Sequence, residues 1–88
     1  MQVAQPDRPL RADAARNRAR VLAQARERMR LTQAQVAKRM NVRPERVSAI
    51  ERAEPGAAEV RTLAAYVRAL GGRLDIIADI DGERIMLR

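Results

Sequence analysis

Arginine is the residue type whose number and spacing could do chemistry in this chain. There are 18 Lys and Arg residues against 11 Asp and Glu, and there is no His and no Cys. The chain therefore lacks the ordinary general base, a thiol nucleophile and the usual zinc ligands. We expect no enzyme activity, no cofactor and no metal site. Guanidinium groups pair with phosphate oxygens and guanine edges, so the composition favours recognition of a polyanion.

The positive charge is concentrated in one part of the chain. Residues 1–52 contain 13 Lys or Arg against 5 Asp or Glu, whereas residues 53–88 contain 5 against 6. Such a field attracts and steers nucleic acid, although a merely solvated basic surface is the competing interpretation. Tyr66 is the only aromatic residue, which disfavours a membrane-surface helix and a single-strand binder that stacks bases. We expect double-stranded DNA as the partner.

The length of 88 residues predicts a single domain without a roomy ligand pocket. Its apolar runs are short, and Asp7, Arg8 and Asp13 stand where a signal peptide would need an apolar core, so we expect a cytoplasmic protein. Residues 1–12 contain Pro6 and Pro9 and are predicted to be a mobile arm. Residues 13–72 are predicted to form the DNA-binding domain and residues 73–88 a hairpin used for dimerisation.

Four helices are expected between residues 13 and 72, and the first two begin at good capping residues. Asp13 is the predicted N-cap of a helix that ends near residue 30, and Thr32 that of a helix over residues 33–40. The first helix is expected to place Val21, Leu22, Ala25 and Met29 inward, and to carry Arg16, Arg18, Arg20, Arg26 and Arg28 on its outer face. The second is expected to bury Val36, Ala37 and Met40.

The third and fourth helices follow a tight turn and a break. Asn41 can take the left-handed conformation that ends a helix, and Pro44 suits the first position of the third helix. Val47 and Ile50 form the predicted buried side of the third helix. Residues 59–70 are expected to form the fourth helix, ended by Gly71 and Gly72, with Val60, Leu63, Ala64, Val67 and Leu70 inward.

The last segment changes to the two-residue period of a strand. Asp81 and Gly82 form a strong two-residue turn, which places Ile80 opposite Glu83 and continues through to Asp75 opposite Arg88. An isolated hairpin is only marginally stable, so we expect this one, together with the fourth helix, to pair with a second copy; burial against the chain's own helices is the alternative. The expected dimerisation residues are Leu74, Ile76, Ile77, Ala78, Ile80, Ile85 and Leu87.

Residues 31–52, LTQAQVAKRMNVRPERVSAIER, resemble the helix-turn-helix of the XRE, or phage-repressor-like, family of regulators. Ala37 is small where the two helices cross, and Asn41 stands at the turn, where the family commonly has glycine. Pro44 occupies a position that often holds a base-reading Gln, which departs from the family pattern. The resemblance implies a mainly helical four-helix domain whose recognition helix enters the major groove.

The resemblance also implies which residues meet DNA. Its groove-facing candidates are Arg43, Pro44, Glu45, Arg46, Ser48 and Ala49, of which all but Pro44 could contact base edges. Gln33, behind the cap Thr32, is placed for a phosphate, and Gln35, Lys38 and Arg52 are candidates for further backbone contacts.

A second resemblance comes from residues 60–76, VRTLAAYVRALGGRLDI, which follow the helix-turn-helix motif. Together with that motif, this ending resembles the HigA-type antitoxins of HigBA toxin–antitoxin modules. That resemblance implies a homodimeric repressor that binds a palindromic operator in its own promoter and neutralises a RelE-like or HigB-like mRNA-cleaving toxin. A solitary XRE-type regulator and a protein-interaction scaffold without specific DNA binding are the alternatives.

Overall fold

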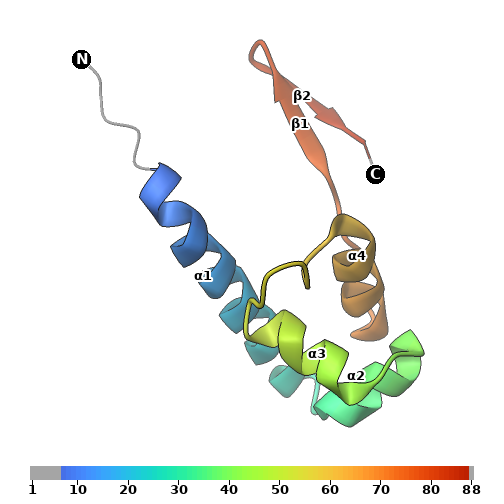
Figure 1. Ribbon diagram of the computed structural model, residues 1–88. Helices are drawn as coiled ribbons and strands as arrows, with labels where there is room; N and C mark the ends of the chain where they lie inside the picture. The colour runs from blue at the N-terminus through green and yellow to red at the C-terminus, as the bar shows by residue number, and fades with distance from the viewer. Residues whose placement is uncertain (1–6, 88) are drawn as a thin grey trace.

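The computed structural model describes residues 7–87, with side chains from residue 13 onward. Its elements are α1 (Asp7–Arg28), α2 (Gln33–Met40), α3 (Pro44–Glu51), α4 (Val60–Ala69), β1 (Ile77–Ile80) and β2 (Glu83–Met86), as Figure 1 shows. The two strands form an antiparallel hairpin after the helices, which confirms the predicted fold class. Within this described part, no helix is both long and apolar enough to cross a membrane.

The first helix begins earlier than predicted. α1 already includes residues 7–12, so Asp13 lies within the helix and is not its N-cap. Pro9 falls in the first turn, where backbone N–H groups have no acceptor within the helix and proline is tolerated. The prediction of an arm over residues 1–12 is therefore wrong for residues 7–12, and residues 1–6 lie outside the described residues.

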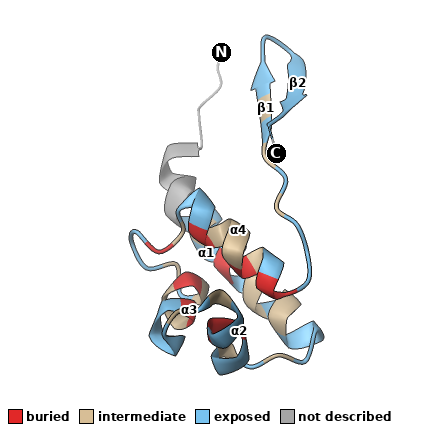
Figure 2. Ribbon diagram, turned by 90° about the vertical axis from the view of Figure 1, so that its right-hand side faces the viewer, coloured by how far each residue is buried: buried red, intermediate tan, exposed pale blue. Residues whose placement is uncertain are grey.

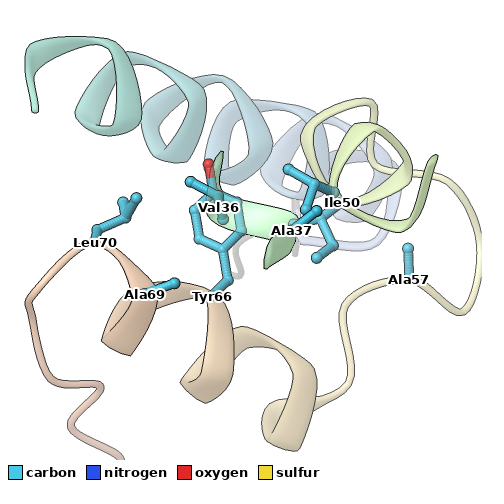
Figure 3. Packing of buried hydrophobic residues seen from close by; sticks show 8 residues of the cluster. Val36, Ala37, Ile50, Ala57, Tyr66, Ala69 and Leu70 are labelled. Carbon is cyan, nitrogen blue, oxygen red and sulfur yellow. The ribbon is translucent and has the colours of Figure 1, made fainter. Parts of the chain in front are cut away.

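The helices enclose a small core centred on Tyr66 (Figure 3). The Tyr66 side chain is fully buried, and its hydroxyl points from α4 towards α1. The predicted buried residues of α2 and α3 are confirmed, with Met40 partly buried at the edge. The fully buried large side chains are Tyr66, Ile50, Val36 and Val47.

Two helices are rotated relative to their predicted inward faces. In α1, Val21 and Met29 are 45% and 55% exposed, whereas Arg26, predicted to face outward, points into the protein. In α4, Val60 is 56% exposed and the buried side consists of Thr62, Tyr66 and Ala69, although Leu70 is buried and Leu63 packs against the core as predicted. Apolar residues cover more than one face of each helix, so contacts made by Arg26 and Tyr66 with distant residues decide the rotation.

The hairpin projects from the helical body with both faces largely exposed (Figures 1 and 2). Its register is the predicted one, from Ile80 opposite Glu83 to Ile77 opposite Met86. The Leu87 N–H donates to the Ile76 carbonyl at 2.7 Å and continues the ladder, whereas the Asp75–Arg88 pair includes a residue outside the described range. The hairpin does not pack against the helices of its own chain, which was the alternative to pairing with a second copy.

Candidate nucleic-acid interface

The start of α2 is closed by a reciprocal pair of hydrogen bonds. Thr32 Oγ1 accepts from the Gln35 backbone N–H at 3.0 Å, and the Gln35 side chain accepts from the Thr32 N–H at 2.8 Å. This capping box satisfies two of the N–H groups that a helix start leaves unpaired. Thr32 and Gln35, both predicted DNA contacts, are therefore held in place by each other before DNA arrives.

The turn into α3 is tight and depends on Asn41. That residue takes φ 62° and ψ 45°, the left-handed conformation that the sequence predicts, and the Val42 N–H donates to the Ala37 carbonyl at 3.0 Å. The chain then runs extended through Arg43 into Pro44, the first helical residue of α3. α2 and α3 thus form a helix-turn-helix in which α2 has the predicted bounds and α3 begins at the predicted Pro44.

The N-terminus of α3 is exposed and has no side-chain cap. Arg43, Pro44, Glu45 and Arg46 all lie at the surface, while Val47 and Ile50 anchor the opposite side of the helix in the core. A helix start presents unpaired N–H groups and a partial positive charge, which favour an anion such as phosphate. Two arginines beside it strengthen this preference.

A buried charge network ties the recognition helix to the other three helices. Glu51, at the end of α3, accepts from Arg26 Nε at 2.7 Å and Nη2 at 3.0 Å, from Gln33 Nε2 at 2.9 Å and from the Tyr66 hydroxyl at 2.5 Å. Arg26 Nη1 donates to the Leu31 carbonyl at 2.7 Å. The Arg26 and Glu51 side chains are only 12% and 5% exposed. A buried carboxylate with this many donors is a rigid junction.

The network shifts the pKa values of its members. Burial alone would raise the pKa of Glu51, but hydrogen bonds from Arg26, Tyr66 and Gln33 and the attraction of Arg26 outweigh it and lower that pKa. The hydrogen bond to Glu51 raises the pKa of Arg26. Burial, followed by the hydrogen bond to Glu51, raises the pKa of the Tyr66 hydroxyl. All three groups therefore keep their ordinary charge states at neutral pH.

The predicted DNA-contact residues divide into two sets by their contacts. Gln33 is bound to Glu51, Arg46 Nη2 donates to Thr62 Oγ1 at 3.3 Å, and Arg52 bonds to Ser48 and Glu54. Lys38, Arg43 and Glu45 are exposed and have no side-chain hydrogen bond or ion pair to any other residue from 13 to 87. Ala49 is half-buried against the core, so less of its methyl group is available to a base than predicted.

The roles of three residues of the buried Glu51 network were not predicted from the sequence. Arg26 was expected on a solvated face, and Glu51 and Tyr66 received no role. They come from three helices, and no spacing rule connects residues so far apart in sequence. The one available signal was the presence of a lone aromatic residue and an isolated acid among basic residues.

Comparison with known proteins identifies the fold of this site. The family profile described as Helix-turn-helix matches residues 22–77, which is most of the described chain. The chain belongs to this Helix-turn-helix family. The match begins in α1 and ends at the first residue of β1, so it includes every member of the Glu51 network.

One named relative of this Helix-turn-helix chain is described as a putative antitoxin. The chain is 49% identical over 57 residues to "Putative antitoxin HigA2" of Mycobacterium tuberculosis (strain ATCC 25618 / H37Rv), a match that covers 65% of this chain and 56% of the relative. It therefore spans little more than half of that relative's length.

Two solved structures are similar at 40% identity and TM-score 0.67. One is "DNA bound antitoxin HigA3", with 76% of this chain and 87% of that chain covered. The other is "Induced DNA bending by unique dimerization of HigA antitoxin", with 75% and 86% covered. Both similarities extend over most of the compared chains, well beyond the two helices of the motif.

Proposed function

We propose that this chain is a sequence-specific DNA-binding repressor that acts as a dimer. The observation that carries the proposal is the exposed start of α3, where Arg43, Pro44 and Glu45 project from a helix held rigid by the Glu51 network. Rigid placement matters because a base-reading side chain must arrive at the groove in a fixed register. The similarity to a DNA-bound antitoxin structure supports the same function.

The contacts of each side chain suggest different roles in DNA recognition. Arg43 is the strongest candidate for a guanine, since its guanidinium makes no competing bond within residues 13–87. Glu45 is a candidate acceptor for cytosine N4. Gln33 has one amide hydrogen on Glu51 and a second that can reach a phosphate. Lys38, Thr32, Gln35, Arg46, Ser48, Ala49 and Arg52 complete the proposed DNA surface.

The relatives support a second part of the function, that of an antitoxin. We propose that the chain belongs to a type II toxin–antitoxin module, represses its own operon from a palindromic operator and binds a RelE-like or HigB-like mRNA-cleaving toxin. This part rests on the similarity to HigA antitoxins. A cytoplasmic location is proposed with it, because both the operator and the mRNA are there.

The hairpin supports the dimer. Ile80, Met86 and Leu87 are 59%, 61% and 58% exposed, which is unusual for large apolar side chains on a two-stranded sheet with open edges. The proposed dimer surface comprises α4 and the hairpin segment residues Leu74, Ile76, Ile77, Ala78, Ile80, Ile85 and Leu87. Two α3 helices in such a dimer should lie about 34 Å apart, one turn of B-DNA.

A gel-shift titration tests the DNA-binding function. The protein is titrated against its own upstream DNA and a scrambled duplex of equal length, at two salt concentrations. Tight binding to the upstream DNA that weakens steeply with salt is the expected result, because each neutralised phosphate releases counterions. Equal and weak binding to both duplexes would overturn the proposal and favour a scaffold that binds protein.

The variant Arg43→Ala sharpens this test. It should weaken binding to the upstream DNA by about 1 to 3 kcal/mol and change the scrambled duplex less, because a base contact is lost. Arg18→Ala is the matched control, since it removes one exposed positive charge from α1, outside both the helix-turn-helix and the hairpin. Co-expression with the neighbouring gene's product then separates an antitoxin from a solitary regulator: only the former restores growth to cells that carry the toxin.

A further inference from the structure

An open groove runs between α4 and the segment that follows it. Its volume is about 360 Å³, and its apolar walls are Val60 and Ala64 on one side and Leu74 and Ile76 on the other. Arg68 and Arg73 also line it; Arg73 Nε is paired with Asp75 Oδ1 at 2.9 Å, whereas Arg68 makes no ion pair with any residue from 13 to 87 and makes that side of the rim basic. Val60, 56% exposed, is a large apolar side chain that this chain leaves uncovered.

The tip of the hairpin has the opposite character. Asp79, Asp81 and Glu83 surround the turn, with Arg84 as the only base among them, and Ile80 stands between them at 59% exposure. In Figures 1 and 2 this turn is the end of the hairpin farthest from α4. The tip therefore combines an exposed apolar side chain with negative charge and lies away from its own groove.

We propose that the hairpin tip of one copy docks in the α4 groove of a second copy, and reciprocally. The two surfaces match in both respects that decide docking: Ile80 would enter the apolar walls, and the acidic residues would meet Arg68 and Arg73. In a twofold dimer the tip of each copy docks in the groove of the other copy, so both grooves are filled and neither tip stays exposed. This inference rests on the proposed dimer and specifies how its hairpins are exchanged.

Opposite charges on two separate surfaces of one chain favour a second copy as the occupant. The tip is acidic although the chain carries a net charge of +7, so the Arg68 side chain of another copy, unpaired within residues 13–87, would attract it. A basic partner protein would suit the tip and leave the basic rim unsatisfied, and DNA would suit the rim and be repelled by the tip. Only the chain itself provides both complements.

Two charge-reversed variants test this exchange. The tip variant is Asp81→Asn with Glu83→Lys, in which Asn-Gly keeps the favoured turn. The rim variant is Arg68→Glu with Arg73→Glu. Each alone should raise the dissociation constant of the dimer at least about tenfold in sedimentation at low salt, because like charges then face each other twice.

An equal mixture of the two variants is the decisive measurement. In the mixed dimer the reversed tip meets the reversed rim and the native tip meets the native rim, so a tight heterodimer should form. A combination of all four substitutions in one chain should also restore the homodimer. Arg16→Glu with Arg20→Glu is the control, an equal charge change on α1 that should leave dimerisation unaltered.

The possible failures are distinguishable. A wild-type protein that sediments as a monomer would refute the proposed dimer itself. A dimer whose strength is the same in the tip and rim variants as in the control would leave the dimer intact and refute the exchange. Weak homodimers without a tight heterodimer would also overturn it, because the charges would then act within one chain.

Discussion

Glu51 is the residue on which the helical domain depends most. It contacts Arg26 from α1, Gln33 from α2 and Tyr66 from α4, so one carboxylate joins all four helices. Its side chain is 5% exposed, and such a charge is tolerated only because a cation and further donors compensate it. Glu51 also holds the Gln33 side chain, which we propose contacts a phosphate.

The variant Glu51→Gln should destabilise the protein by about 3 to 5 kcal/mol, because it keeps the shape of the side chain but removes the buried carboxylate that compensates the charge of Arg26. Urea unfolding followed by circular dichroism measures this. Glu27→Gln is the control: this acid on α1 lies 3.9 Å from Arg26 Nη2 but is 67% exposed, so its loss should change the free energy of unfolding little. Equal stability of the two variants would show that the network contributes nothing.

Stability should also depend on pH through Glu51. Its pKa is lowered from 4.5 in the folded protein, so the unfolded chain binds a proton first as the pH falls. The contribution is fully present above the unfolded pKa and is lost as the pH falls through the folded one. Urea unfolding from about pH 7 to about pH 3 should therefore bring wild type and Glu51→Gln closer together. A constant difference between them would contradict this.

Arg46 was expected to read a base, and its hydrogen bond to Thr62 suggests a second role in fixing α3 to α4. Arg46→Ala should cost roughly 1 to 3 kcal/mol on the operator and relax preference at one base position if the guanidinium leaves Thr62 for a guanine. A similar loss on every duplex would make Arg46 a phosphate contact. Binding to a panel of single-base operator variants separates the two results.

Among the elements, α2 is the one most dependent on its ends. It has only 8 residues, too few for a stable isolated helix, and is closed by the capping box at Thr32 and the left-handed Asn41. Its packing side, Val36 and Ala37, is completely buried. Caps and burial together set the angle at which α3 leaves the turn.

Thr32→Ala should lower the free energy of unfolding by about 1 kcal/mol, since the Gln35 N–H loses its acceptor. For a domain of this size that corresponds to a fall in Tm of roughly 4 to 8 °C, measurable by thermal denaturation. Thr32→Ser keeps the hydroxyl and should retain most of the stability. If serine and alanine lowered Tm equally, the cap would not be the cause.

At the scale of the whole molecule, the basic helix-turn-helix in the middle of the chain and the C-terminal hairpin lie in different parts of the structure (Figures 1 and 2). The hairpin contributes little to the core, which is formed by the helices. This separation would let DNA and a second copy bind at the same time. The proposed dimer should in turn strengthen DNA binding, because the second half-site would be reached at high effective concentration.

Ile80→Asp should therefore give a folded monomer that binds DNA much more weakly. Ile80 is 59% exposed, so the substitution should leave the helical core and its Tm nearly unchanged. Sedimentation measures the oligomeric state, and the gel shift measures the loss of DNA binding. A variant that remained dimeric would exclude the hairpin as the interface.

Local patterns in the sequence determined the elements that contain short-range signals. Thr32, Asn41 and Pro44 mark the bounds of α2 and α3, and Asp81 with Gly82 marks the hairpin and its register, because caps and turns depend on residues a few positions apart. The resemblance of residues 31–52 to a known motif then indicated the class of partner.

The tertiary structure alone decided which face of α1 and α4 is buried and which side chains are already engaged. Arg26 points inward because it pairs with Glu51, which is 25 residues away in the sequence. Tyr66 sets the rotation of α4 because its hydroxyl donates to the same carboxylate. Such contacts leave no periodic trace, since they join residues that are distant in sequence. The start of α1 was missed because a proline in a first turn is compatible with both a helix and an arm.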